Sequence, residues 1–200
     1  MVQPSEKSQT GSVSLIALGS NATSCFGVPY DTVRRAVTAL ADAGLTVVAQ
    51  SRFYRTPAFP AGIGEDFVNA VVQLRSDHDA PAMLELLHRI EADFGRHRTI
   101  RWGARTLDLD LLDHDGAVHP DHAGWQAWRD LTLDQQRVQT PEQLILPHPR
   151  VQDRAFVLVP LADVAPDWRH PVTALSAQQM LDALPHEHLT GITPLSPADH

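Results

Sequence analysis

The 200-residue chain has one cysteine, Cys25, one lysine, Lys7, and only 6% aromatic residues. A single cysteine cannot form an intrachain disulfide, and it excludes a zinc site built from several cysteines. No apolar run approaches the roughly 18 residues that a membrane span needs. The first 12 residues are polar and lack the apolar core of a signal peptide. We therefore expect a soluble, cytoplasmic protein without a membrane partner.

Positive charge is also scarce, because 16 Lys and Arg stand against 24 Asp and Glu, for a net charge of -8. An acidic total argues against general nucleic-acid binding, so we expect no nucleic-acid partner. It does not exclude a local basic cluster that binds a small anion. The hydrophobic fraction of 43% suits a globular core, and the length suits one domain.

Apolar periodicity predicts alternating strands and helices. Strand-like segments, short and apolar or alternating, cover residues 13–18, 45–54, 66–75 and 106–113. Helical spacing covers residues 29–43 and the segment from Asp79, a candidate N-cap, to a stop at Gly95. The order β-α-β-β-α-β is typical of an α+β, ferredoxin-like fold. We expect an antiparallel sheet with both helices on one face.

The remaining segments are expected to surround this core. The predicted parts are a single domain over 13–185, an insertion over about 114–146, a flexible leader over 1–12 and a flexible tail over 186–200. The insertion carries helical spacing over 125–139. Its His114, His119 and His122 could bind a metal, but a solvated polar loop is the favoured interpretation. An apolar C-terminal addition over 154–164 should pack on the core, with Pro160 limiting any helix there.

A pair of aspartates in the fourth predicted strand suggests chemistry. Since strand side chains alternate, Leu107 and Leu109 should face the helices, while Asp108 and Asp110 share the other face about 6–7 Å apart. Two carboxylates suit Mg²⁺, which shares its ligand shell with water and substrate phosphates. A solvated surface is the alternative for such a pair alone.

A cluster of arginines precedes the aspartates. It consists of Arg96, Arg98, Arg101 and Arg105. Guanidinium groups form paired hydrogen bonds with phosphate oxygens. Magnesium-bound ATP would balance the charge of both clusters, whereas the carboxylates alone would repel it. A solvated basic loop remains the alternative.

Six ordered segments resemble the 6-hydroxymethyl-7,8-dihydropterin pyrophosphokinase family. They are 18–21 (LGSN), 54–57 (YRTP), 67–70 (FVNA), Ile90-Glu91 with Gly95-Arg96, 101–110 (RWGARTLDLD), and Pro147-His148 with Arg154-Ala155-Phe156. The resemblance implies an enzyme of folate biosynthesis that transfers pyrophosphate from ATP to the hydroxymethyl oxygen of 6-hydroxymethyl-7,8-dihydropterin and releases AMP. It implies two Mg²⁺ ions as cofactors and ATP as co-substrate. We expect a monomer.

The same resemblance assigns roles to individual residues. It implies two magnesium ligands, Asp108 and Asp110. It implies a catalytic set of Arg96, Arg98, Arg105 and Asp110. The implied ATP-binding residues are Arg98, Arg105, His148 and Arg154. The implied pterin-binding and lid residues are Thr56, Phe59, Phe67, Asn69, Trp102 and Phe156.

The chain departs from the family pattern at a few positions. Phe67 stands where tyrosine is expected, and Gln143 and Ile145 stand where some members carry Arg and Thr that help to bind ATP. No general base is evident. Two other functions stay open: an RNA-binding module using the basic stretch, and a non-catalytic regulator that binds ATP or pterin.

Overall fold

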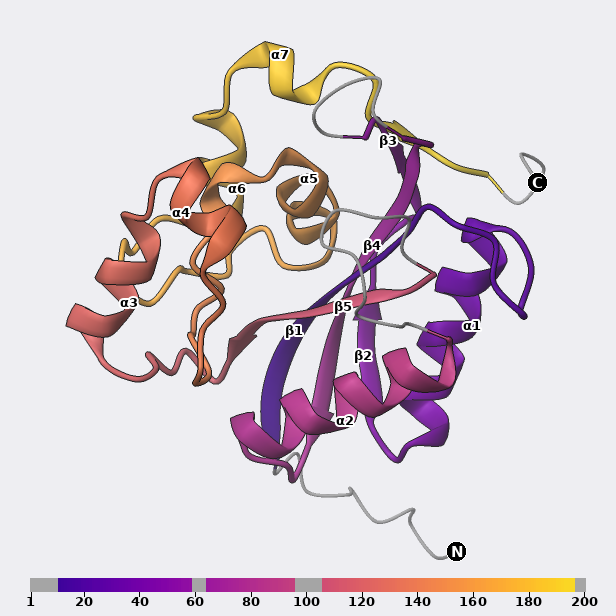
Figure 1. Ribbon diagram of the computed structural model, residues 1–200, viewed down its shortest axis with the longest axis horizontal. Helices are drawn as coiled ribbons and strands as arrows, with labels where there is room; N and C mark the ends of the chain where they lie inside the picture. The colour runs from indigo at the N-terminus through magenta and orange to yellow at the C-terminus, as the bar shows by residue number, and fades with distance from the viewer. Residues whose placement is uncertain (1–10, 59–63, 96–105, 197–200) are drawn as a thin grey trace, which may run out of the picture.

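An antiparallel sheet forms the centre of the molecule in the computed structural model, which describes residues 11–58, 64–95 and 106–196 (Figure 1). Its strands are β1 (Ser12–Ser20), β2 (Thr46–Gln50), β3 (Tyr54–Thr56), β4 (Phe67–Ser76), β5 (Asp108–His114) and β6 (Thr193–Pro194). The order is β5-β1-β4-β3-β6, and β2 pairs with β4 beside β3. All pairs are antiparallel. The predicted sheet is confirmed.

The strand expected over 45–54 is divided into β2 and β3. At the division, the Ser51 amide donates to the Val71 carbonyl at 2.9 Å, and the Ser51 hydroxyl accepts from the Val71 amide at 2.9 Å. A side-chain oxygen therefore replaces a backbone carbonyl in the ladder, and the chain turns there.

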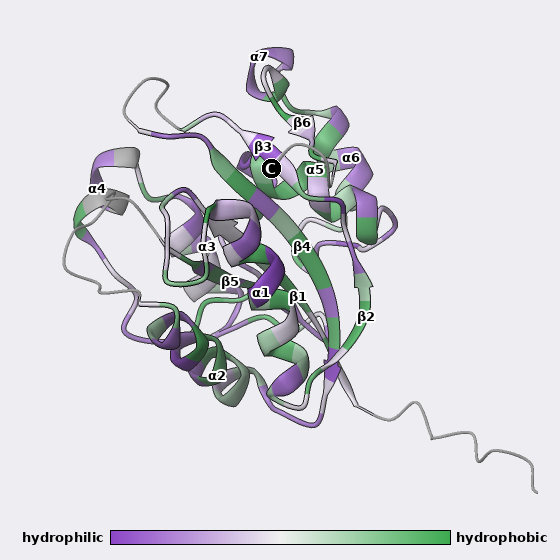
Figure 2. Cartoon of the chain, turned by 90° about the vertical axis from the view of Figure 1, so that its right-hand side faces the viewer, coloured by the Kyte–Doolittle hydropathy of each residue, from purple (hydrophilic) through white to green (hydrophobic). Residues whose placement is uncertain are grey.

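Two helices, α1 (Pro29–Asp42) and α2 (Ala80–Asp93), cover one face of the sheet, as expected (Figure 1). The Asp79 side chain caps α2 by accepting from the Ala82 amide at 2.9 Å. The helices and the sheet share one apolar core, to which β4 contributes a largely hydrophobic strand (Figure 2). Its fully buried members include Ile16, Leu18, Val33, Leu40, Met83 and Leu87.

A second layer of helices covers the opposite face. Helices α5 (Ala155–Val164) and α6 (Ala177–Asp182) pack with Leu15, Ala17, Val71 and Leu112 of the sheet. The expectation that Pro160 would limit a helix is wrong, because α5 runs through it. Proline removes one helical hydrogen bond, but Pro160 is buried in a helix whose apolar side chains pack on the sheet, and tertiary packing offsets the loss.

The helical spacing predicted in the insertion is confirmed, whereas His114, expected in a solvated loop, is buried. It contains α3 (His122–Arg129) and α4 (Leu133–Val138). Trp125 is 1% exposed, and its indole N–H donates to the Pro147 carbonyl at 2.8 Å. His114 is buried and shares a hydrogen bond with the Ser14 hydroxyl at 2.9 Å. Among the described residues, no three His, Cys, Asp or Glu side chains are grouped to hold a metal ion.

Residues 186–196 correct the expectation of a loose tail. They form α7 (His186–Leu189) and β6, which pairs with β3, and the Leu195 amide donates to the Phe53 carbonyl at 2.8 Å. No helix in the described ranges is long and apolar enough to cross a membrane.

Candidate active site

Three neighbouring strands place two of the predicted site residues, Asn69 and Asp108, in one row. Gly19 of β1 is paired with Asn69 of β4 on one side and with Asp108 of β5 on the other. Directly paired residues project toward the same face of a sheet. Asn69 and Asp108 therefore lie on either side of a residue that has no side chain. The next row on the same face joins Val71, Ala17 and Asp110 in the same way.

The alternation predicted for β5 is confirmed. Leu107 and Leu109 are 0% and 3% exposed in the core under α1 and α2. Asp108 and Asp110 are partly exposed and belong to the face that α5 covers in part. The two carboxylates are therefore adjacent on one face, as a metal pair requires.

A buried carboxylate of α2 fixes the strand between these aspartates. Glu91 is 2% exposed, and its Oε1 accepts from the Leu109 amide at 2.7 Å. Reasoning from the sequence noted Glu91 only as part of a family segment and missed this contact. A glutamate on the apolar face of a predicted helix, one residue after Ile90, was the available signal, since a buried carboxylate needs a partner.

The start of α5 brings Arg154 to the aspartates. Its guanidinium Nη1 lies 3.3 Å from Oδ2 of Asp110. The same guanidinium lies 5.7 Å from the centre of the Phe156 ring, within cation–π range. The structure thus brings together three residues predicted separately: Asp110, Arg154 and Phe156.

His148 lies beside the outer edge of β5, where its amide donates to the Leu112 carbonyl at 2.8 Å. Burial among protein atoms and, to a smaller extent, the Arg154 charge lower the pKa of His148 to about 3, while Asp108 opposes the shift. The ring is neutral at pH 7. Its Nδ1 accepts from the Arg150 amide at 3.1 Å, so the ring hydrogen resides on Nε2 and can be donated to a ligand oxygen.

The other end of the row contains a short polar network. The Asn69 amide donates to the Thr56 hydroxyl at 2.7 Å, and these side chains are 7% and 1% exposed. A Cβ atom placed on Gly19 would lie 2.7 Å from Asn69 Oδ1 and 3.9 Å from Phe67 Cδ1. Phe67 and Asn69 therefore lie beside Gly19, and Thr56 is joined to this group through Asn69.

The remaining predicted site residues are less informative. Phe59, Arg96, Arg98, Trp102 and Arg105 lie outside the described residues. Ile145 is buried at 7% exposure, and Gln143 is exposed.

The fold and the site together define a ferredoxin-like protein with an aspartate pair, an arginine and a neutral histidine at one end of its sheet. The sequence model of the 7,8-dihydro-6-hydroxymethylpterin-pyrophosphokinase (HPPK) family matches residues 15–166. The chain belongs to this family. The predicted enzyme class is thereby confirmed: it is a pyrophosphokinase of folate biosynthesis.

Individual relatives agree with the family match. The chain is 34% identical over 197 residues to the 2-amino-4-hydroxy-6-hydroxymethyldihydropteridine pyrophosphokinase of Synechocystis, covering 98% of this chain and 87% of that one. It is 34% identical over 170 residues to the protein of the same name from Bacillus subtilis, covering 84% and 86%.

The solved structure of wild-type Plasmodium falciparum HPPK-DHPS is similar in fold. The TM-score is 0.59 at 14% identity, with 86% of this chain and 44% of that chain covered. The chain thus spans less than half the length of that protein, and the likeness supports the fold alone.

Proposed function

We propose that the chain transfers pyrophosphate from ATP to the hydroxymethyl oxygen of 6-hydroxymethyl-7,8-dihydropterin. The oxygen forms a bond with the β-phosphorus, the bond from that phosphorus to the oxygen bridging to the α-phosphate breaks, and AMP leaves with the bridging oxygen. The hydroxyl proton passes to solvent. The observation that carries the proposal is the row Asn69–Gly19–Asp108, because it joins an amide suited to a pterin edge to a carboxylate suited to a metal.

Asp108 and Asp110 are the proposed ligands of two Mg²⁺ ions. Both carboxylates are partly exposed on one face, and no group of three or more metal-binding side chains is found among the described residues. A site of two carboxylates, completed by water and phosphate oxygens, suits magnesium better than metals that need an all-protein shell. When bound, magnesium would neutralise the phosphate charge that these carboxylates otherwise repel.

Arg154 and His148 are proposed to bind the phosphates. The Arg154 guanidinium already faces the carboxylate pair through Asp110, so a phosphate bound there would lie within reach of its other donors. The neutral His148 would donate its Nε2 hydrogen to a phosphate oxygen without adding charge. Arg96, Arg98 and Arg105 complete the proposed charge balance, with Arg96 or Arg98 stabilising the transition state.

The pterin is proposed to bind at the Asn69 end of the row. The hydrogen bond from Asn69 to Thr56 fixes the amide, so that its edge is oriented before the ligand arrives. Phe67 and Phe156 would stack on the flat ring. The backbone at Thr56 and Phe59 would complete the recognition of the pterin edge, and Trp102 would belong to a closing lid.

The test is AMP formation from ATP, measured with and without hydroxymethyldihydropterin and Mg²⁺. We expect AMP only when both are present. We expect Asp108→Asn and Asp110→Asn to lower kcat/KM by about 10²-fold or more, with unchanged melting temperatures. Asp42→Asn, at an exposed position in α1, is the matched control and should keep full activity.

Two results would contradict the proposal. If no AMP forms with ATP, hydroxymethyldihydropterin and Mg²⁺ present, the proposed transfer is wrong, and the alternative of a protein that binds ATP or pterin without turnover is favoured. Near-normal rates in either aspartate variant would show that these carboxylates are not the metal ligands.

The expectations of a cytoplasmic monomer without a nucleic-acid partner stay predictions. Size-exclusion chromatography with light scattering checks the oligomeric state.

A further inference from the structure

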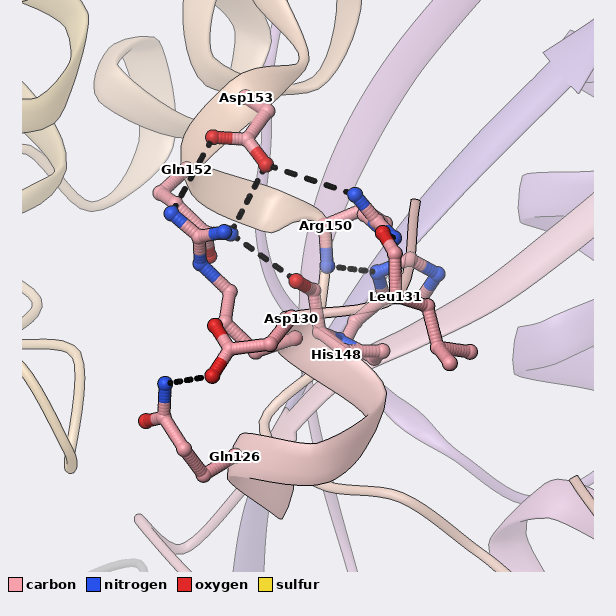
Figure 3. Close-up of polar contacts among 9 residues, drawn as sticks. Gln126, Asp130, Leu131, His148, Arg150, Gln152 and Asp153 are labelled. Carbon is pink, nitrogen blue, oxygen red and sulfur yellow. Dashed lines mark hydrogen bonds and ion pairs between the residues drawn. The ribbon is translucent and has the colours of Figure 1, made fainter. Parts of the chain in front are cut away.

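The insertion and the segment 147–154 are joined by a set of polar contacts, some of which are drawn in Figure 3. That segment carries His148 and Arg154. We propose that Arg150 is a positioning residue for the nucleotide: it ties this segment to the insertion and thereby holds the phosphate-binding side chains in place. The inference rests on the proposed function, since it concerns the ATP side of the same site.

The Arg150 side chain bridges the two parts of the chain. Its Nη2 donates to the Leu131 carbonyl of the insertion at 3.0 Å, and its Nη1 lies 3.9 Å from Asp153 Oδ2 (Figure 3). The Arg150 side chain is 16% exposed, whereas that of Asp153 is 45% exposed. The guanidinium is therefore largely enclosed, and its contacts are less screened by water than those of a surface pair.

The backbone of the same residue sets the state of His148. The Arg150 amide donates to His148 Nδ1 at 3.1 Å, which leaves the hydrogen on Nε2. A partner on one ring nitrogen fixes both the tautomer and the direction of the other nitrogen. A movement of Arg150 would therefore misdirect the donor that is proposed to reach ATP.

The insertion is itself firmly attached, so it can serve as an anchor. The Trp125 indole donates to the Pro147 carbonyl at 2.8 Å. Within the insertion, His119 and Leu146 exchange two backbone hydrogen bonds, at 2.8 and 3.2 Å, and so hold its two ends together. Arg129 lies 3.8 Å from Asp153. The insertion thus contacts residues just before His148 and just before Arg154, and Arg150 is the contact between them.

The test compares Arg150→Ala and Arg150→Gln with wild type. Arg150→Ala removes the bridge and keeps the backbone amide, while Arg150→Gln keeps an uncharged donor for the Leu131 carbonyl and is the variant of choice if Arg150→Ala does not fold. Gln126→Ala is the matched control, because the Gln126 side-chain amide donates to Asp130 within the insertion, at 2.8 Å. The readouts are KM for ATP, KM for the pterin, kcat, and the affinity for magnesium-bound α,β-methylene-ATP by calorimetry.

We expect Arg150→Ala to raise KM for ATP and weaken the analogue about tenfold, which corresponds to ~1.4 kcal/mol. KM for the pterin should not change, Arg150→Gln should recover part of the loss, and Gln126→Ala should match wild type. Unchanged analogue affinity in Arg150→Ala, or an equal rise in both KM values with a lower melting temperature, would overturn the inference.

The two proposals fail differently. If wild type binds the analogue but makes no AMP, the proposed reaction is wrong, but calorimetry with the analogue still tests whether Arg150 affects nucleotide affinity. If wild type does not bind the analogue, both are wrong.

Discussion

Gly19→Ala adds one methyl group at the centre of the row that joins Asn69 to Asp108. The added Cβ would lie 2.7 Å from Asn69 Oδ1, closer than real Cβ contacts allow. Gly19 does not have a positive φ, so alanine brings no backbone strain. By restricting the unfolded chain, alanine alone would stabilise the protein by roughly 0.4–1 kcal/mol. The clash and this gain therefore act in opposite directions.

The clash is the larger effect because Asn69 cannot move freely. Its amide donates to the buried Thr56 hydroxyl at 2.7 Å. Losing such a bond and leaving a buried partner unsatisfied costs about 1–3 kcal/mol. We expect a net loss of about 1–2 kcal/mol in the free energy of unfolding. If the displaced amide also loses its proposed hydrogen bond to the pterin edge, kcat/KM for the pterin should fall about tenfold for each ~1.4 kcal/mol of binding energy lost.

A double-mutant cycle with Asn69→Ala isolates this contact. Each variant is measured by urea unfolding and by initial rates with varied pterin at saturating ATP. Since the methyl acts through Asn69, Gly19→Ala should have much less effect in the Asn69→Ala background, with a coupling energy of about 1 kcal/mol or more. Effects that add within about 0.5 kcal/mol, or a rise in KM for ATP in place of the pterin, would refute the reasoning.

Two further predictions concern buried polar groups. Glu91→Leu leaves the Leu109 amide without its 2.7 Å acceptor and should destabilise the fold by about 1–3 kcal/mol; an unchanged urea midpoint would contradict this. Burial lowers the pKa of His170 to about 4, so below pH 6.5 the unfolded state gains a proton that the folded state does not. This protonation lowers the free energy of unfolding, by about 2 kcal/mol at pH 5, and the effect vanishes well above pH 6.5. If the free energy of unfolding has the same pH dependence in wild type and in His170→Gln, the prediction is wrong.

Local patterns in the sequence were sufficient for much of the fold. The Asp79 cap depends on residues three positions apart, and the two faces of β5 depend on strict alternation from Leu107 to Asp110. Neither requires knowledge of distant contacts, which is why both predictions hold. The aspartate pair was predictable for the same reason.

Contacts between distant segments account for what reasoning from the sequence missed. Helical spacing in the insertion was visible in the sequence, but its packing partners were not: Trp125 is buried, donates a hydrogen bond to the Pro147 carbonyl and makes an edge-on ring contact with His170, 5.2 Å between centres. The end of the chain looked loose because two residues of β6 become a strand only by pairing with β3. The role of Gly19 depends on the register of β1 against β4 and β5, which no local pattern contains.

The two faces of the sheet are packed differently. Under α1 and α2, large side chains such as Leu18 and Leu74 are fully buried in one continuous core. The opposite face carries Leu15, Val71 and Leu112 under α5 and α6, but in β1 it changes to the small residues Ala17 and Gly19 where the site begins. A larger residue at position 19 would bury more apolar surface, at about 25 cal/mol per Å², but its Cβ would lie 2.7 Å from Asn69 Oδ1 and push the amide off Thr56. Glycine at position 19 therefore leaves the Asn69 amide on Thr56, and the continuous core on the far side keeps the strands in register.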